Sequence, residues 1–527
     1  MEIKIYGGIN EIGGNKIFIN INERRFLFDF GLSFNENNQY FSEFLSPRKF
    51  NGIIDYLYLG LIPPLNGLYR NDLVIPFKET LRKDPYNIVP SDKSIIDACF
   101  LSHAHLDHYK FIGFLQKNTP LYMNWISYVL LDFLTKTTKD SINPEILNFY
   151  EFFKTIPKKK QKKGTEIEYK RATKKDYKDH ETKRKVTLMR ENVPYIFNST
   201  AGNIHITQNP TDHSIPGACS FIVEHDGRSI IYTGDFRRHG VHSEWVENFI
   251  RIAQKSNPIA IIAEGSRVPP SKSFRNGSYK SDDKTEQDVK LHSSDLIKDY
   301  PGLILINLQS RNLDRILTYY NLAKKFNRIL AVSPKIFLLI DSFKAKLGDL
   351  DENTIQEFYN AYTLPEFDDQ HFMIYLERKG WGKFELIDYK GLQKGIFKNY
   401  KFLTHKDIKK EPERYLLYMD YFMLNELIDL DQKLNSVMFI SSTTDPFNEE
   451  MVIQEEKLNA WLKRFGVLKT ETMHSSGHCF TDQLIEFLQK IDADNIIPIH
   501  TENPETFKEF GLSGNVILPK KGDNYFI

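Results

Sequence analysis

Short apolar runs separated by polar turns dominate both ends of this chain, and they predict strands. The run from Ile95 to Leu101 is typical of a buried strand, and the apolar residues at 111–115 suit one face of a helix. The run Cys219–Val223 predicts another strand. Residues 1–264 are therefore expected to alternate short strands with helices.

The middle of the chain has a different pattern. A polar linker at 267–284, rich in Ser, Pro, Lys and Asp, is followed by alternating helical and strand periodicity. The predicted elements are a helix at Glu286–Ile297, a strand at Leu303–Asn307, a helix at Leu313–Lys325 and a strand at Arg328–Val332. This alternation indicates a small α/β domain with parallel strands at 265–435.

Residues 436–527 are expected to return to the first domain. They contain a predicted strand at Val437–Ile440, a long amphipathic helix at Asn448–Phe465 and a short apolar strand that ends at His500. One domain would then interrupt another, with a cleft between them.

The most informative stretch for chemistry is Ser-His-Ala-His-Leu-Asp-His at 102–108. It places four potential metal ligands on one loop between a predicted strand and a predicted helix: His103, His105, Asp107 and His108. Imidazole and carboxylate together suit zinc or another borderline divalent ion. A polar loop that is merely rich in His is the alternative interpretation.

Three further donors lie at or just before predicted strand ends, namely His213, Asp235 and His500. Each alone could be a structural His or an Asp that caps a turn. Together with residues 102–108 they supply about the seven donors that a site for two metal ions needs.

These motifs resemble the metallo-β-lactamase superfamily, and in particular the ribonuclease J group of its β-CASP nuclease branch. The segment Gly-Gly-Ile-Asn-Glu-Ile-Gly-Gly-Asn at 7–15 and Phe-Leu-Phe-Asp-Phe-Gly at 26–31 look like the opening hairpins, with Asp29 as the first motif. Residues 103–108, His213 and Asp235 match the second, third and fourth motifs, and Glu264, His478 and His500 match motifs A, B and C. The resemblance covers about residues 1–270 and 436–527.

The resemblance implies an α/β fold: a metallo-β-lactamase αββα sandwich with an inserted β-CASP α/β domain. It implies two divalent metal ions, zinc first and manganese as the alternative. One ion would bind His103, His105 and His213, the second Asp107, His108 and His500, and Asp235 would bridge them. Asp29 would support the ligands without binding metal. His478 would be the general acid, oriented by Glu264, and Asp107 would take part in catalysis through its metal.

Two segments are candidates for phosphate binding. Ser475, Ser476 and Gly477 precede an apparent helix at Phe480–Ile491, whose N-terminus would attract anions; a structural loop is the alternative. Asn312 and Arg315 lie where similar nucleases seat a 5′-phosphate, but a helix N-cap with surface arginines is an equal interpretation.

Composition adds few constraints. The 527 residues carry a formal net charge of +1, and three widely separated cysteines imply no disulfide framework, so a reducing cytoplasm is expected. No secretory signal or membrane-spanning run is evident. Residues 154–190 hold fifteen Lys or Arg against five Asp or Glu, which predicts a loop or hairpin that either contacts RNA phosphates or is only solvated.

The function favoured by the resemblance is a ribonuclease that cleaves RNA phosphodiester bonds with metal-activated water. We expect it to act as a 5′–3′ exonuclease, with endonuclease activity as a second possibility. A small-molecule metallo-hydrolase and a non-catalytic RNA-binding scaffold are the alternatives. Only 27 residues follow His500, so the C-terminal domain of bacterial ribonuclease J is expected to be missing, and a homodimer stays open.

Overall fold

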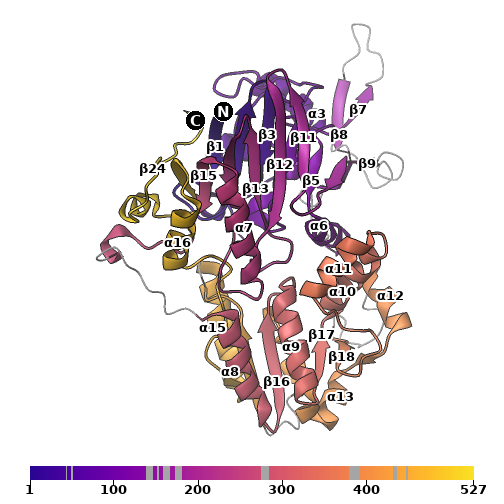
Figure 1. The fold of residues 1–527 in the computed structure, drawn as a ribbon. Coiled ribbons are helices and arrows are strands. Elements are labelled where there is room, and N and C mark those ends of the chain that lie inside the picture. Colours follow the sequence, from indigo (N-terminus) through magenta and orange to yellow (C-terminus); the bar gives the residue numbers. More distant parts are fainter. Residues whose placement is uncertain are drawn as a thin grey trace.

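The chain forms two lobes that meet along one side (Figure 1). The computed structural model describes residues 1–527 except 43, 49–50, 138–145, 151–152, 158–166, 172–180, 275–283, 379–391, 431–435 and 447–448. Both ends of the chain lie in the upper lobe, and the lower lobe comes from the middle of the sequence.

Two seven-stranded sheets face each other in the upper lobe. Their orders are β10-β5-β4-β3-β2-β1-β25 and β11-β12-β13-β14-β15-β23-β24. The first contains β1 (Glu2–Gly7), β2 (Lys16–Ile21), β3 (Arg24–Phe28), β4 (Ala98–Phe100), β5 (Leu121–Met123), β10 (Val186–Leu188) and β25 (Asn524–Phe526). The second contains β11 (Pro194–Ser199), β12 (Gly202–Pro210), β13 (Cys219–His225), β14 (Arg228–Tyr232), β15 (Pro258–Glu264), β23 (Asn495–Ile499) and β24 (Asn515–Val516).

Apolar side chains fill the space between these sheets. Ile3 and Ile5 of β1 alternate with partly exposed neighbours and are fully buried against residues of the second sheet such as Phe221. A separate cluster joins the outer face of the second sheet to α7 and α16, and the largest cluster covers the outer face of the first. The layers are therefore helix, sheet, sheet and helix, which confirms the predicted sandwich.

The helices of this lobe are mostly short. They are α1 (Phe34–Asn38), α2 (Ile54–Tyr58), α3 (Asn71–Val74), α4 (Lys78–Leu81), α5 (Leu106–Tyr109), α6 (Trp125–Thr137), α7 (Ser243–Lys255) and α16 (Thr481–Ile491). Within the described part of the chain, no helix is long and apolar enough to cross a membrane.

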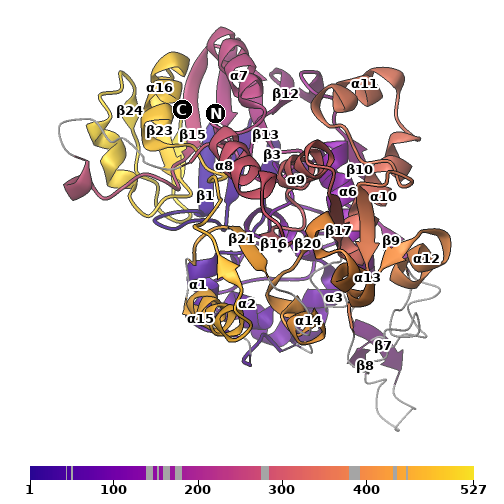
Figure 2. The same cartoon turned by 90° about the horizontal axis from the view of Figure 1, so that it is seen from below.

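The lower lobe contains a third sheet, of order β19-β18-β17-β20-β16-β21-β22, in which every pair is parallel. Helices α8 and α9 lie on one face and α14 and α15 on the other (Figure 2). The strands are β16 (Leu303–Leu308), β17 (Ile329–Val332), β18 (Phe372–Tyr375), β19 (Phe402–Leu403), β20 (Tyr415–Tyr418), β21 (Val437–Ser442) and β22 (Leu468–Lys469). The helices are α8 (Glu286–Lys298), α9 (Leu313–Lys325), α10 (Pro334–Leu347), α11 (Glu352–Ala361), α12 (Leu392–Asn399), α13 (His405–Lys410), α14 (Glu426–Leu430) and α15 (Glu449–Arg464).

One strand lies in a different sheet from the expected one. The prediction returned the chain to the first domain at residue 436, but β21 pairs with β16 along six residues, and β22 follows it in the same sheet. All six residues of β21 are buried. A short apolar run shows that a strand is buried but not which sheet buries it, so the third sheet extends to Lys469.

The helix expected after residues 102–108 is also different. Helix α5 begins inside the motif at Leu106 and ends at Tyr109, and residues 112–114 form only a 3₁₀ turn. Phe30 accounts for this, because its N–H donates to His108 O and its carbonyl accepts from Phe111 N. The strand-to-helix loop is thus bonded to the segment that follows β3.

The basic stretch forms two short antiparallel pairs: β6 (Asn148–Tyr150) with β9 (Glu181–Lys183), and β7 (Phe153–Pro157) with β8 (Ile167–Arg171). The lysines at 158–163 lie outside the described residues. Arg184 belongs to the stretch that was expected either to contact RNA phosphates or to be only solvated, but its side chain is buried and donates to the carbonyls of Gly113, Leu115 and Gln116. Its role is therefore to hold a loop of the first domain.

Gly31 provides a test of how closely these segments pack. A Cβ at this position would lie 1.5 Å from the carbonyl oxygen of Asp107. We expect Gly31→Ala to lower the free energy of unfolding by about 3 kcal/mol or more, because neither backbone can move aside. Thermal and denaturant unfolding measure this. Gly348→Ala is the control: its nearest neighbour would be 3.5 Å away, and a change below about 1 kcal/mol is expected there.

Candidate metal centre

The donors predicted from the sequence are brought together because each follows the end of a strand. Residues 103–108 follow β4, Asp235 follows β14 and His500 follows β23. His213 lies in the connection from β12 to β13. These ends meet at one rim of the two sheets, so rigid elements hold donors that are almost 400 residues apart in the chain.

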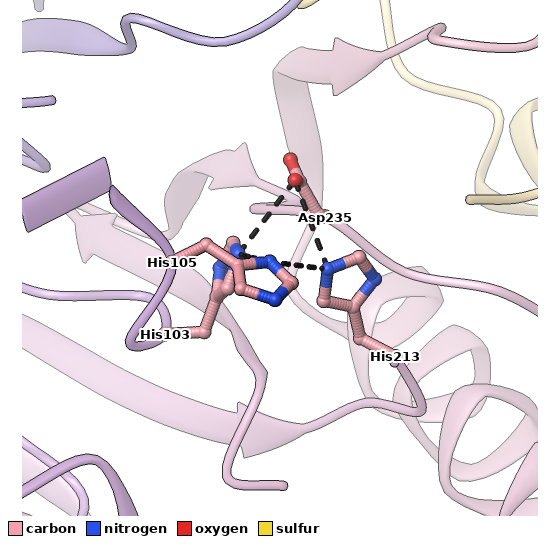
Figure 3. A group of neighbouring side chains, drawn as sticks. All are labelled: His103, His105, His213 and Asp235. Carbon is pink, nitrogen blue, oxygen red and sulfur yellow. Dashed lines mark hydrogen bonds and ion pairs between the residues drawn. The ribbon is translucent and has the colours of Figure 1, made fainter. Parts of the chain in front are cut away.

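The first group contains His103, His105, His213 and Asp235, whose side chains point toward one another (Figure 3). Nδ1 of His105 lies 3.1 Å from Nε2 of His103 and 3.0 Å from Nε2 of His213. Oδ2 of Asp235 lies 3.7 Å from His103 Nε2 and 4.0 Å from His213 Nε2. Three ring nitrogens and one carboxylate oxygen therefore face a common point.

The second group contains Asp107, His108, His500 and again Asp235, all of them buried. The same Oδ2 of Asp235 lies 3.1 Å from His108 Nε2 and 3.5 Å from His500 Nε2. His500 Nε2 is also 3.2 Å from Asp107 Oδ2. Asp235 is thus shared by both groups, as a bridging ligand must be.

The protonation states in the first group suit metal binding. Burial lowers the pKa of His103 and His213 well below the ordinary value and that of His105 to about 3, so all three rings are neutral at neutral pH. Neutral imidazole is the form that binds a metal ion.

The second group differs, because negative charge from carboxylates dominates it. Burial opposes protonation of His108, but the carboxylates of Asp235, Asp107 and Asp29 outweigh it and raise the pKa of His108 well above its ordinary value. A buried proton or a bound cation has to compensate these carboxylates.

Asp29 orients this group from behind. Its carboxylate accepts from the backbone N–H and the hydroxyl of Ser102 and from the Tyr232 hydroxyl, and it lies 2.7 Å from His108 Nδ1. A carboxylate on the far nitrogen of a ligand His fixes the ring and its tautomer. Both Asp29 and His500 have a positive φ, near 55° and 52°, a conformation that non-glycine residues keep only where the surroundings impose it.

A third cluster adjoins the second group. Nδ1 of His478 lies 3.3 Å from Glu264 Oε1, and the Ser266 hydroxyl lies 3.0 Å from the same nitrogen and 2.7 Å from His500 Nδ1. Ser266 also donates to Glu264 Oε2 through its N–H and its hydroxyl. Ser266 was missed in the sequence analysis; its place two residues after Glu264 is the only signal for it.

The residues present fit divalent metal ions. In each group the possible ligand atoms all lie within 4.8 Å of one another. Oδ1 of Asp235 is buried and has no hydrogen-bond partner among the described residues, although a buried carboxylate oxygen is costly to leave unpaired. Nitrogen and carboxylate donors without thiolate suit zinc, and also manganese.

A cleft of about 780 Å³ opens over this site between the two lobes. From the upper lobe it is lined by His105, Asp107 and His478, together with two of the candidate phosphate-binding residues, Ser476 and Gly477. Ser475 does not line the cleft, because its side chain is buried. Helix α16 begins only at Thr481, so residues 475–477 precede its first turn by several residues.

Arg315 is not available for a phosphate. Its buried guanidinium donates to both oxygens of Glu286, to the hydroxyl and carbonyl of Ser442 and to Met473 O. Asn312 lines the cleft, but its side chain caps α9 by accepting from Arg315 N. Asn312 is thus a helix N-cap, as the alternative interpretation expected, but Arg315 is buried and is not the surface arginine of that interpretation.

The sequence analysis also missed Arg237. Its fully buried guanidinium lies 2.7 Å from Asp212, 2.7 Å from Glu286 and 3.6 Å from Asp314. Asp212 precedes a metal-ligand candidate, whereas Glu286 and Asp314 belong to α8 and α9 of the lower lobe. Arg237 therefore ties a loop of the site to the second lobe.

We expect Arg237→Met to lower the free energy of unfolding by about 3–5 kcal/mol, because it leaves Asp212 buried without its guanidinium partner. Denaturant unfolding of the purified chain measures the loss. Arg190→Met is the control, since Arg190 pairs with Asp351 at the surface and should change stability by less than about 1 kcal/mol. Equal effects of the two substitutions would contradict a linking role for Arg237.

Comparison with known proteins agrees with this geometry. Residues 467–509, which include His478 and His500, match the Zn-dependent metallo-hydrolase RNA specificity domain. Ribonuclease J 2 of Streptococcus pyogenes serotype M3 is 22% identical over 327 residues, 61% of this chain and 43% of the relative, so the match spans less than half of that relative. The crystal structure of a protein of unknown function from Enterococcus faecalis V583 shares the fold, with a TM-score of 0.66, 19% identity and 99% of both chains covered. The segment at 467–509 and the match to ribonuclease J 2 thus make this chain similar to Zn-dependent metallo-hydrolases of the ribonuclease J kind.

Proposed function

We propose that this protein is a metal-dependent ribonuclease that hydrolyses phosphodiester bonds. The observation that carries the proposal is the convergence of seven nitrogen and oxygen donors beside a cleft between two lobes, which His105 and Asp107 of this set line. Two of the clustered histidines, His478 and His500, lie in the segment similar to an RNA specificity domain.

Two divalent ions, zinc first, would occupy the two groups. The proposed ligands are His103, His105 and His213 for one ion, Asp107, His108 and His500 for the other, and Asp235 for both. When bound, such ions lower the pKa of a coordinated water and neutralise charge that develops on phosphoryl oxygens. Asp29 keeps His108 in the orientation that ligation needs.

His478 would donate the proton to the leaving oxygen. It lines the cleft, and its ring is held by Glu264 and Ser266. Burial alone would lower the pKa of His478, but the charge and hydrogen bond of Glu264, helped by Asp235 and Asp107, raise it to about 9. The imidazole is then protonated at neutral pH, which a general acid requires.

The mode of attack that we propose is removal of nucleotides from the 5′ end, with internal cleavage as a second mode. The support is the resemblance of the motifs to the ribonuclease J group. Assays on linear RNA with a 5′-monophosphate, on its 5′-triphosphate form and on circular RNA separate the modes, because only internal cleavage opens a circle.

The decisive experiment combines metal analysis with RNA hydrolysis. We expect close to two equivalents of metal per chain and no hydrolysis in chelator. Asp235→Asn should lose metal and lower the rate by several orders of magnitude, because both groups share this carboxylate. Asp226→Asn, in an exposed turn, is the matched control and should keep both properties. Full hydrolysis in chelator would reject the proposal.

The acid is tested by His478→Ala. Turnover should fall by roughly 10²–10⁴-fold while the metal content stays the same, because the proton donor is lost and the ligands remain. Initial rates and elemental analysis measure the two quantities. His292→Ala, on the exposed face of α8, should leave both unchanged. Loss of metal in His478→Ala would make His478 a ligand instead of an acid.

A further inference from the structure

Arg311 reaches from the lower lobe to the metal-binding loop of the upper lobe. It lies between β16 and α9, and its Nη1 donates to the carbonyl of Ala104 at 3.1 Å. Ala104 separates the two ligand candidates His103 and His105. Arg311 also lines the cleft together with His105. The guanidinium of Arg311, from the lower lobe, therefore lies directly beside the proposed metal centre.

The guanidinium of Arg311 retains donors for a ligand. Besides Ala104 O, it is hydrogen-bonded to the side chain of Tyr109, so these contacts account for two of its five N–H groups. Its side chain is half-buried at the cleft wall. Arg315, one helical turn later, differs completely, because Glu286 and two backbone carbonyls occupy its guanidinium.

The charge of Arg311 is not neutralised by a direct partner. Among the residues that the structure describes, no carboxylate forms an ion pair with it, and a second cation, Lys335, lies close enough to interact electrostatically. Asp420 is near Lys335, and the carboxylates that face the cleft are Asp107 and Glu502. Since Asp107 is a proposed metal ligand, the guanidinium is left to interact with an anion that enters the cleft.

We propose that Arg311 binds a phosphate group of the substrate immediately beside the metal centre, and so holds both lobes around the RNA. This inference rests on the proposed function. A guanidinium offers paired N–H donors that match two phosphate oxygens, whereas a Lys ammonium offers a single point charge. The residue thus sets the position of the phosphate relative to His105 and His478 without taking part in proton transfer.

The test compares Arg311→Gln and Arg311→Lys with the exposed control Arg228→Gln. With short 5′-monophosphate RNA, Arg311→Gln should lower kcat/KM by about 10²-fold, as the loss of one donor to a developing charge does elsewhere. Arg311→Lys should fall between it and wild type. Metal content should be the same in all variants. Unchanged kcat/KM in Arg311→Gln, or a fall matched by metal loss, would overturn the inference.

Two readouts separate phosphate binding from a structural role. Sulfur in place of a non-bridging oxygen at the cleaved phosphate should slow wild type more than Arg311→Gln, because the variant has already lost the contact. A similar sulfur effect in both would overturn the inference. In chelator, where hydrolysis stops, Arg311→Gln should bind RNA more weakly and with a salt slope smaller by about 0.7, and the control should not.

The binding readout also keeps the two proposals distinguishable. A wild-type chain that binds RNA but never hydrolyses it would reject the proposed function, and the salt slope of Arg311→Gln would still judge Arg311. If the wild-type chain hydrolyses RNA, and the Arg311→Gln variant is as active and binds RNA as tightly, only the role of Arg311 is rejected.

Discussion

The burial of one carboxylate, Asp235, among five imidazoles is the constraint on which the rest of the structure depends. Oδ2 of this residue lies within 4.0 Å of a ring nitrogen of His103, His108, His213, His478 and His500. Such a cluster is unstable in a protein interior unless its charges are balanced and its atoms are held apart. The strand ends of two sheets supply the rigidity, and a bound divalent cation would supply the charge balance.

Buried charges close to Asp235 also join the two lobes. Arg237 follows Asp235 by two residues and bonds to Asp212, which precedes His213. Its second partner, Glu286, is also bound by Arg315 of α9. Buried ion pairs add little net stability compared with apolar packing, but their directional bonds permit only one arrangement. The lobe that carries Arg311 is therefore held in register with the ligand loops.

Sequence reasoning succeeded where the information was local. Helix α9 begins and ends at the predicted residues, and the order His-x-His-x-Asp-His identified a set of donors that the structure brings together. It failed where partners are distant along the chain. The strand at 437–442 has the same pattern whichever sheet receives it, and only its pairing with β16 decides. Ser475 looked like a phosphate ligand because no local pattern reveals that its side chain is buried.

The arginines illustrate the limit most clearly. Arg184, Arg237 and Arg315 are all buried, and the groups that surround them are carbonyls and carboxylates of the protein itself. The sequence analysis chose Arg315, with Asn312, as a candidate for phosphate binding and did not single out Arg311. The first turn of α9 decides between them: its N-cap fixes Asn312, and position 315 is then directed into the protein and toward Glu286. Arg311 precedes the helix and faces the cleft. The number of basic residues therefore overstates the surface available to a polyanion, and the position of each cation relative to buried carboxylates decides which ones remain for the substrate.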